Sequence, residues 1–282
     1  MEDLIITKAS GAEAIFSFEK LRQSMRNSGA NEVQIDKVIE DITPRLHQGV
    51  STKKIYKWAF ALLKKTSKHV AAKYQLKMAI MELGPSGFPF EKYIAELYKR
   101  QEYKVKVGTI VQGNCVTHEV DVLATTEKEH LIVECKFHSL QGKQSDVKVS
   151  LYFHSRFRDL HSQWILRPEI ASKKIEGWIV TNTRFSPDAL QYANCVGLKL
   201  LSWDFPQGNG LKDLVERYFL YPITCLTSIT KLEKEKLLLE NVVFCEDILV
   251  KQEKLRKVGI IDRRVNVILE EVKNMKDSNQ KK

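Results

Sequence analysis

The chain has 282 residues, which is enough for one large domain or for two to three small ones. Its hydrophobic content of 43% is typical of a globular protein with a packed core and excludes a disordered chain. The 45 lysines and arginines exceed the 35 aspartates and glutamates by ten. This basic balance favours a polyanionic partner such as nucleic acid, although a soluble basic protein without such a partner has the same composition.

Cysteine spacing and hydropathy restrict the compartment. The five cysteines are far apart, without the paired spacing of a zinc site or of a disulfide framework. The start, MEDLIITKAS, lacks the basic head and long apolar core of a secretory signal, and no apolar run is long enough to span a bilayer. We therefore expect a cytoplasmic protein without a membrane partner.

The first segment, residues 1–84, is expected to be a small and mostly helical domain that begins with a short strand and turn. Ser17 can cap its first helix and Gly29 can end it. The breaker cluster GPSGFP closes the segment. The periodicity predicts four helices, at residues 17–29, 31–42, 51–65 and 71–84.

Strands alternate with helices in the second segment, residues 85–206, which predicts an α/β layer with a partly parallel sheet. The third segment, residues 207–282, begins at the turn cluster PQGNG and reads as helical up to a frayed tail at 276–282. The elements of the second segment are expected as helix 90–101, strand 103–113, a hairpin over 118–138, helix 146–165, strand 177–181, helix 186–197 and strand 198–203.

Charged residues interrupt the apolar hairpin HEVDVLATTEKEHLIVECKFH. Because side chains alternate across a strand, Asp121 and Glu134 each point away from the apolar face of their strand. If the two strands pair, both carboxylates converge within reach of one divalent cation. Mg²⁺ keeps several waters, so two acids and a backbone carbonyl, that of Cys135, suffice to hold it. Lys136 would then hold an attacking water and stabilise the developing charge. A half-solvated strand without a catalytic role has the same alternation.

This pattern, Asp121 followed by Glu134-Cys135-Lys136, resembles the PD-(D/E)xK motif of restriction-endonuclease-like folds, most closely that of the Mrr-type enzymes. The likeness spans residues 88–204 and includes the order of the elements. It implies a central αβα sheet domain that hydrolyses phosphodiester bonds in DNA with Mg²⁺. In that family a glutamate of the first helix often joins the metal site.

By position, the resemblance assigns Asp121 and Glu134 to the metal, Lys136 to the water and Glu91 to the assisting acid. No proline precedes Asp121. His118 and His138 flank the motif, and we interpret both as incidental.

Basic residues accumulate in the first segment without any acidic residue between Asp41 and Glu82. Such a run is usually a solvated helix face, but uncompensated charge of this density favours a phosphate partner. The basic residues of the run are Arg45, Lys53, Lys54, Lys57, Lys64, Lys65, Lys68, Lys73 and Lys77.

The first segment also resembles the ATP-cone, a regulatory nucleotide-binding domain known from ribonucleotide reductases. The likeness rests on IITKASG and IFSFEKL, on GVSTKKIYKWAFALL and on AAKYQLKMAI. It departs from the family at Ala9, where a second basic residue usually follows the lysine. A helical DNA-binding or dimerisation domain without a nucleotide is the alternative.

The ATP-cone resemblance implies ATP or dATP as a regulatory ligand. Lys8 and Lys20 would meet its phosphates, Ser17 and Thr52 would offer hydroxyls from helix starts, and Ile6 would line the base pocket. Amines act as point charges and the amides of a helix start favour anions, so these residue types suit a nucleotide.

The helical third segment loosely resembles tandem helix-hairpin-helix modules, and a packing or dimerisation role is the alternative. Taken together, the resemblances imply a Mg²⁺-dependent DNA endonuclease of the restriction or defence kind, regulated by ATP or dATP and assembled as a homo-oligomer. Two alternatives stay open: a nucleotide-sensing DNA-binding regulator without nuclease activity, and a structure-specific junction resolvase with the same chemistry.

Overall fold

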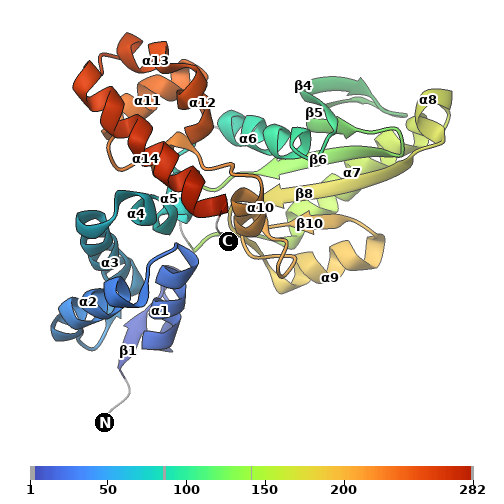
Figure 1. Ribbon diagram of the computed structural model, residues 1–282. Coiled ribbons are helices and arrows are strands. Elements are labelled where there is room, and N and C mark those ends of the chain that lie inside the picture. Colours follow the sequence, from blue (N-terminus) through green and yellow to red (C-terminus); the bar gives the residue numbers. More distant parts are fainter. Residues whose placement is uncertain (1–3, 85–86, 141, 281–282) are drawn as a thin grey trace. The chain divides into compact units, whose positions relative to one another are not determined.

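The computed structural model describes residues 4–84, 87–140 and 142–280 and combines sheets with many helices (Figure 1). The chain forms two compact units. Unit 1 joins residues 1–82 with residues 219–282, and unit 2 comprises residues 83–218. Residues 207–218, which the sequence placed at the start of the C-terminal region, thus belong to unit 2. No helix in the part of the chain that the structure describes is long and apolar enough to cross a membrane.

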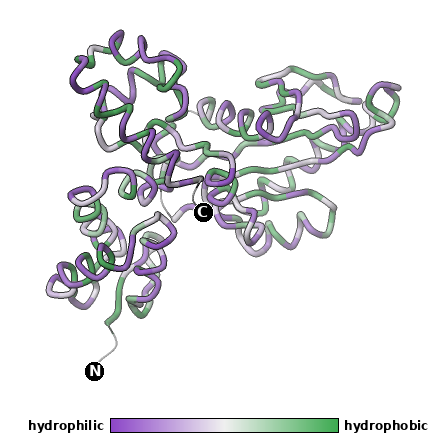
Figure 2. Tube along the Cα trace, viewed as in Figure 1, coloured by the Kyte–Doolittle hydropathy of each residue, from purple (hydrophilic) through white to green (hydrophobic). Residues whose placement is uncertain are grey.

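Unit 1 begins with a small sheet in the order β2-β1-β3. Strand β1 (Ile5–Thr7) pairs antiparallel with β2 (Glu13–Ile15) and parallel with β3 (Val50–Ser51). The helices of this part are α1 (Phe18–Asn27), α2 (Glu32–Ile42), the short η1 (Thr43–Arg45), α3 (Thr52–Thr66), α4 (Lys68–Tyr74) and α5 (Leu76–Met81). Buried residues of α1, α2, α3 and α4 pack into a common core, and apolar and polar stretches alternate along these helices (Figure 2).

Hydroxyl side chains cap the first and third helices of unit 1. The hydroxyl of Ser17 accepts a hydrogen bond from the Lys20 amide at 3.3 Å, as the sequence predicts. The cap of α3 is Ser51 and not Thr52, because the Ser51 hydroxyl accepts from the Lys54 amide at 3.3 Å while Thr52 already occupies the first helical position.

The single helix expected at 71–84 is instead two helices, α4 and α5, which meet at Gln75. The side chain of Gln75 donates a hydrogen bond to the carbonyl of Cys225, and the Thr224 hydroxyl donates to the carbonyl of Ala79 at 2.6 Å. These bonds attach the turn η2 (Ile223–Cys225) to α5. The break in the helix therefore lies where a segment distant in the sequence docks.

The C-terminal part of unit 1 is helical up to Gln280. Its last helix continues through the tail that was expected to fray, and Lys281 and Lys282 lie outside the described residues. The buried carboxylate of Glu271 accepts hydrogen bonds from the amides and hydroxyls of Thr227 and Ser228, which fixes the loop before the helices. The helices are α11 (Lys231–Leu239), α12 (Cys245–Val250), α13 (Gln252–Lys257) and α14 (Asp262–Gln280).

Unit 2 contains a five-stranded sheet in the order β10-β8-β6-β5-β4. Strands β4, β5 and β6 form an antiparallel meander, whereas β6, β8 and β10 are parallel, so the predicted partly parallel sheet is present. The strands are β4 (Lys104–Gln112), β5 (Thr117–Thr125), β6 (Glu129–Lys136), β8 (Lys174–Thr181) and β10 (Lys199–Leu201), with a separate parallel pair β7 (Gln144–Ser145) and β9 (Arg184–Phe185).

Helices cover both faces of this sheet. Ile132 clusters with residues of α7 (Val147–Trp164) and α9 (Pro187–Val196). Its neighbour in the strand, Leu131, lies in a pocket with residues of α6 (Phe88–Lys99). Since adjacent strand residues point to opposite faces, α6 packs on one face and α7 with α9 on the other. Two short helices, α8 (Pro168–Ala171) and α10 (Leu211–Arg217), complete the unit.

Helix α7 offers a matched test of this packing. Leu160 is 1% exposed and Leu151 on the same helix is 44% exposed. We expect Leu160→Ala to lower the free energy of unfolding by about 2–5 kcal/mol, because a buried cavity is left behind. Leu151→Ala is expected to change it by less than about 0.5 kcal/mol. Urea unfolding of the full chain measures both values, and equal losses would contradict the assigned faces of α7.

Candidate functional site

The predicted acids of the hairpin meet where β5 and β6 stop pairing. The backbone ladder between these strands extends from Thr125 opposite His130 to Val122 opposite Val133 and ends there. Beyond that point the side chain of Asp121 replaces the ladder: its Oδ2 accepts a hydrogen bond from the backbone amide of Cys135 at 2.6 Å. Since Cys135 follows Glu134 directly, this bond places the Asp121 carboxylate beside the second acid of the motif.

The pKa values of the three predicted acids show that they lie in a partly buried, mutually repulsive cluster. Burial raises the pKa of Glu134 to about 7, and the charge of Asp121 adds to that shift. Burial likewise raises the pKa of Glu91 to about 7, with the charges of Asp121 and Glu119 adding to it. The pKa of Asp121 is raised as well, chiefly by burial. Carboxylates in this state gain from a cation between them.

Lys136 lies close enough for its charge to act on this cluster. Its side chain is exposed, and its ammonium group lowers the pKa of both Asp121 and Glu134. The structure therefore brings the amine of Lys136 close to the carboxylates of Asp121 and Glu134, as the sequence predicts. Glu91, in the first turn of α6, is the third acid.

Arg156 of α7 is part of this cluster, and the sequence reasoning missed it. Its Nη1 lies 2.6 Å from Oε2 of Glu134, and its Nη2 donates to the backbone carbonyl of Glu119. The charge of Arg156 also lowers the pKa of Asp121. The predicted helix 146–165 contained this arginine, but only the docking of α7 on the sheet shows which turn of that helix reaches the acids.

The two flanking histidines have other partners. Nε2 of His118 lies 2.7 Å from Oδ2 of Asp159, whose carboxylate also accepts from the amide of Cys115. These bonds hold the pKa of Asp159 at about 2 and tie the β4–β5 turn to α7. His138 bonds instead to the hydroxyl of Ser145 at 3.0 Å.

The residues present fit a Mg²⁺ ion better than a metal with many protein ligands. Within the described ranges no group of three or more His, Cys, Asp or Glu side chains is arranged to hold a metal ion. Mg²⁺ requires only one or two carboxylates because it retains water. Oδ1 of Asp121 and Oε1 of Glu134 both stay without a hydrogen-bond partner among the described residues, since Cys135 and Arg156 occupy only the other oxygen of each. One oxygen from each acid therefore remains for a cation.

A cavity of about 360 Å³ in unit 1 is lined by all five residues assigned to a nucleotide, namely Ile6, Lys8, Ser17, Lys20 and Thr52. Among the residues that the structure describes, no acidic side chain lines it, so the two lysines give it a positive character. Tyr56 and Tyr74 stack at a ring distance of 4.8 Å and also line the cavity, and the sequence reasoning did not include them. The remaining lining residues are Ala14, Ile15, Phe16, Leu21, Ser24 and Ile55.

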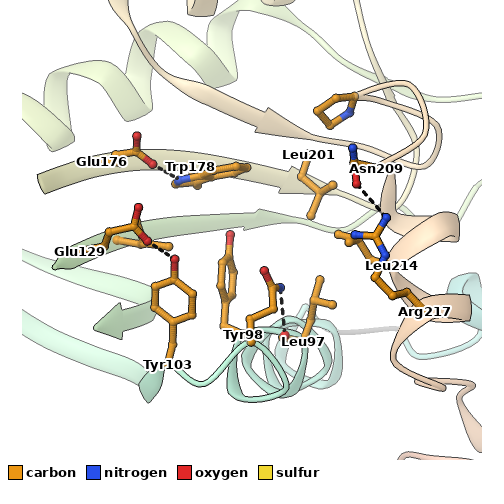
Figure 3. Close-up of a pocket in the computed structure, with 13 residues that line it drawn as sticks. Leu97, Tyr98, Tyr103, Glu129, Glu176, Trp178, Leu201, Asn209, Leu214 and Arg217 are labelled. Carbon is orange, nitrogen blue, oxygen red and sulfur yellow. Dashed lines mark hydrogen bonds between the residues drawn. The ribbon is translucent and has the colours of Figure 1, made fainter. Parts of the chain in front are cut away.

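A further cavity, of about 250 Å³, lies in unit 2 between α6 and the sheet (Figure 3). Its two acids already have partners: the hydroxyl of Tyr103 donates to Glu129, and Nε1 of Trp178 donates to Glu176 at 3.0 Å. None of the predicted catalytic residues lines it. Glu129 precedes Glu134 by five strand residues, or roughly 16 Å. This cavity is therefore separate from the acidic cluster.

Comparisons with known proteins agree with the fold of unit 2. Residues 84–204 match the model of the restriction endonuclease family Mrr_cat, and residues 221–275 match the model described as AF1548-like, C-terminal. The predicted restriction-endonuclease-like domain is thereby confirmed. The ATP-cone remains a prediction.

Two of the comparisons found similarity over most of the other protein's length. An uncharacterized protein of Archaeoglobus fulgidus is 36% identical over 183 residues, which are 64% of this chain and 99% of that protein. The crystal structure of AF1548, a protein of unknown function, has 34% identity and a TM-score of 0.54, and the match covers 67% of this chain and 97% of AF1548.

The raised pKa of Glu91 predicts that replacing this carboxyl with a neutral side chain stabilises the folded protein, by an amount that depends on pH. Below about pH 4.5 this carboxyl is protonated in both the folded and the unfolded chain. Between 4.5 and 7 the folded state binds more protons, so the cost of the charge grows with pH and is complete above pH 7.

We therefore expect Glu91→Gln to raise Tm in EDTA by about 2 °C at pH 8, a small value because the group is partly exposed to screening solvent. Little change is expected at pH 5. Thermal unfolding at both values measures this, with Glu127→Gln in the exposed β5–β6 turn as the matched control. A gain of equal size at both pH values would contradict the assigned pKa.

Proposed function

The chain belongs to the AF1548-like family, and we propose that it is a Mg²⁺-dependent DNA endonuclease regulated by ATP or dATP. The observation that carries the proposal is the position of the Asp121 carboxylate on the amide of Cys135, beside Glu134 and within the field of Lys136. The restriction-endonuclease match over residues 84–204 supports the reaction class. That the protein is a cytoplasmic homo-oligomer active in restriction or defence stays a prediction from the sequence.

In this proposal Asp121 and Glu134 each hold the ion through the oxygen that the protein leaves without a partner, and the backbone carbonyl of Cys135 is the third ligand. Mg²⁺, when bound, polarises the scissile phosphate and makes its water more acidic. Lys136 holds the attacking water and stabilises the charge that develops on the phosphate. Glu91 completes the acidic cluster from α6.

Arg156 positions Glu134 in this scheme. Its guanidinium occupies one oxygen of that carboxylate at 2.6 Å, so the other oxygen would be available to hold the ion. Because the same guanidinium also bonds the carbonyl of Glu119, the acid is held between α7 and β5 and does not need to reorganise when the ion binds. Such preorganisation is what makes charged groups effective in catalysis.

The nuclease assignment predicts that Glu134→Ala and Lys136→Ala each lower the rate of DNA cleavage in Mg²⁺ by at least about 100-fold, since each removes a group that acts on the transition state. Cleavage of plasmid DNA, methylated and unmethylated, measures the rate. Lys128→Ala, in the exposed β5–β6 turn, is the control and should cleave like the wild type. Undiminished cleavage by both site variants would refute the roles assigned here. Wild-type binding to DNA without cleavage in Mg²⁺ would identify a regulator instead.

The cavity of unit 1 supports the nucleotide part of the proposal. Lys8 and Lys20 supply positive charge without an acidic side chain among the described lining residues, and the apolar wall around Ile6 suits a base. The start of α3 at Thr52 presents amides that favour a phosphate. A cavity of about 360 Å³ lies in the range of small-molecule sites. A regulatory ligand must bind two states of the protein with different affinity.

We expect Lys8→Ala and Lys20→Ala to weaken ATP binding by about tenfold or more each, because each removes a charged partner of the phosphates. Calorimetry with ATP and dATP measures this, with Lys37→Ala on the exposed side of α2 as the control. Following sedimentation and cleavage rate at saturating ATP tests the regulation. If ATP binds but leaves sedimentation and cleavage rate unchanged, ATP does not regulate the protein. If the wild type does not bind ATP or dATP, the proposed nucleotide site is refuted.

A further inference from the structure

Helix α3 carries five exposed lysines, Lys53, Lys54, Lys57, Lys64 and Lys65, which are called the lysine stripe below. The stripe belongs to unit 1 and lies outside the nucleotide cavity. Of the residues of α3, only Thr52, Ile55 and Tyr56 line that cavity. The function of the stripe is therefore not explained by the nucleotide proposed above.

Helical geometry places the five lysines on one face. With about 100° per residue, they fall within an arc of roughly 120°. The buried residues Ile55, Ala59 and Leu63 centre on the opposite side of the same helix. Ala61 lies within the lysine arc, is exposed and is small, so it does not obstruct a partner that approaches the stripe.

The stripe lacks the ion pairs that other basic residues of unit 1 have. Arg26 lies 2.6 Å from both Glu19 and Glu32, and Arg22 lies 2.5 Å from Asp36. Among the described residues no acidic side chain forms an ion pair with any lysine of the stripe. This agrees with the absence of acidic residues between positions 41 and 82 in the sequence. Unpaired like charges repel one another and contribute nothing to folding, so their clustering on one face favours an anionic partner.

The mean charge density of the stripe is similar to that of a polyphosphate. Twelve residues separate Lys53 from Lys65, so the stripe is about 18 Å long and carries roughly one positive charge per 3.6 Å. One strand of duplex DNA carries one negative charge per about 3.4 Å along the helix axis. A membrane surface fits less well, because a membrane-binding helix requires an apolar face that is free to insert, and that of α3 is buried in the core.

We propose that the lysine stripe of α3 binds the sugar–phosphate backbone of duplex DNA without regard to sequence and so anchors the substrate of the nuclease. The inference rests on the proposed function, since it takes DNA as the substrate. Phosphate contacts of this kind position a duplex but do not read its bases. Their free energy comes from the release of condensed counterions and therefore falls steeply with salt.

The test compares two triple variants of the full chain that remove the same charge. Lys57→Gln, Lys64→Gln and Lys65→Gln remove three of the five positive charges of the stripe. Lys104→Gln, Lys106→Gln and Lys128→Gln remove three exposed lysines from the end of the unit 2 sheet that bears the β5–β6 turn. Fluorescence anisotropy with labelled duplexes of two unrelated sequences, in EDTA, measures binding without cleavage between about 50 and 200 mM salt.

We expect the stripe variant to bind both duplexes at least about tenfold more weakly at the upper salt concentration and to reduce the slope of log K against log salt by about 2 to 3, at roughly 0.9 per lost phosphate contact. The control variant should keep the wild-type slope, and ATP binding should be unchanged in both.

Three results would overturn the inference. Equal losses in both triple variants would mean that binding follows net charge alone. A wild-type slope in the stripe variant, with DNA still cleaved in Mg²⁺, would refute DNA binding by the stripe but not the nuclease function. Failure of the wild type both to bind and to cleave DNA would refute both DNA binding by the stripe and the proposed function.

Discussion

The hydrogen bond from the backbone amide of Cys135 to the carboxylate of Asp121 is the interaction on which the candidate site depends. It forms where the β5–β6 ladder ends, so a side chain continues the connection that the backbone no longer makes. A buried carboxylate is costly unless donors or cations compensate it. The amide of Cys135, the guanidinium of Arg156 and the ammonium of Lys136 compensate the Asp121 carboxylate in part, yet its pKa stays raised. The pKa of the neighbouring Glu134 is raised as well, to about 7. The remaining deficit of positive charge is what a divalent cation would supply.

The rest of unit 2 keeps this arrangement rigid. Glu134 and Cys135 pair in register with Ile179 and Val180 of the parallel strand β8, and both partners are fully buried. The end of β6 is thus held on one side by a core strand and on the other by the side chain of Asp121. Helix α7 packs on this sheet through Phe153 and other buried residues of a common cluster, and it brings Arg156 to the acids. Stability of the core and geometry of the site therefore rest on the same helix.

Much of this arrangement follows from local rules. Alternation along the strands predicted that Asp121, Glu134 and Lys136 could converge if the strands pair, and the family resemblance selected them; the five residues chosen by the ATP-cone resemblance line one cavity. What could not be predicted depends on docking between distant segments. Arg156 reaches Glu134 through the packing of α7 on the sheet, and the helix break at Gln75 lies where η2 docks. The union of residues 219–282 with the N-terminal segment is of the same kind, since no periodicity in either segment specifies the other.

The positions of the basic residues in the structure are more informative about their role than the net charge of the chain. Where basic residues stabilise the fold, they are paired, as Arg26 is with Glu32 and as Arg264 is with Glu233 at 2.5 Å. Lys8, Lys20 and the lysine stripe form no such pairs among the described residues, and they lie in a cavity or along one helix face. Pairing these groups internally would add little to stability, because exposed ion pairs contribute about 0–1 kcal/mol, but it would remove the free charge that a phosphate needs. Unit 2 has the opposite arrangement, in which acids are gathered and only partly neutralised. A phosphate group is repelled by such acids unless a cation lies between them, so the proposed nuclease would need both a cation at the carboxylates and unpaired basic residues that hold the substrate.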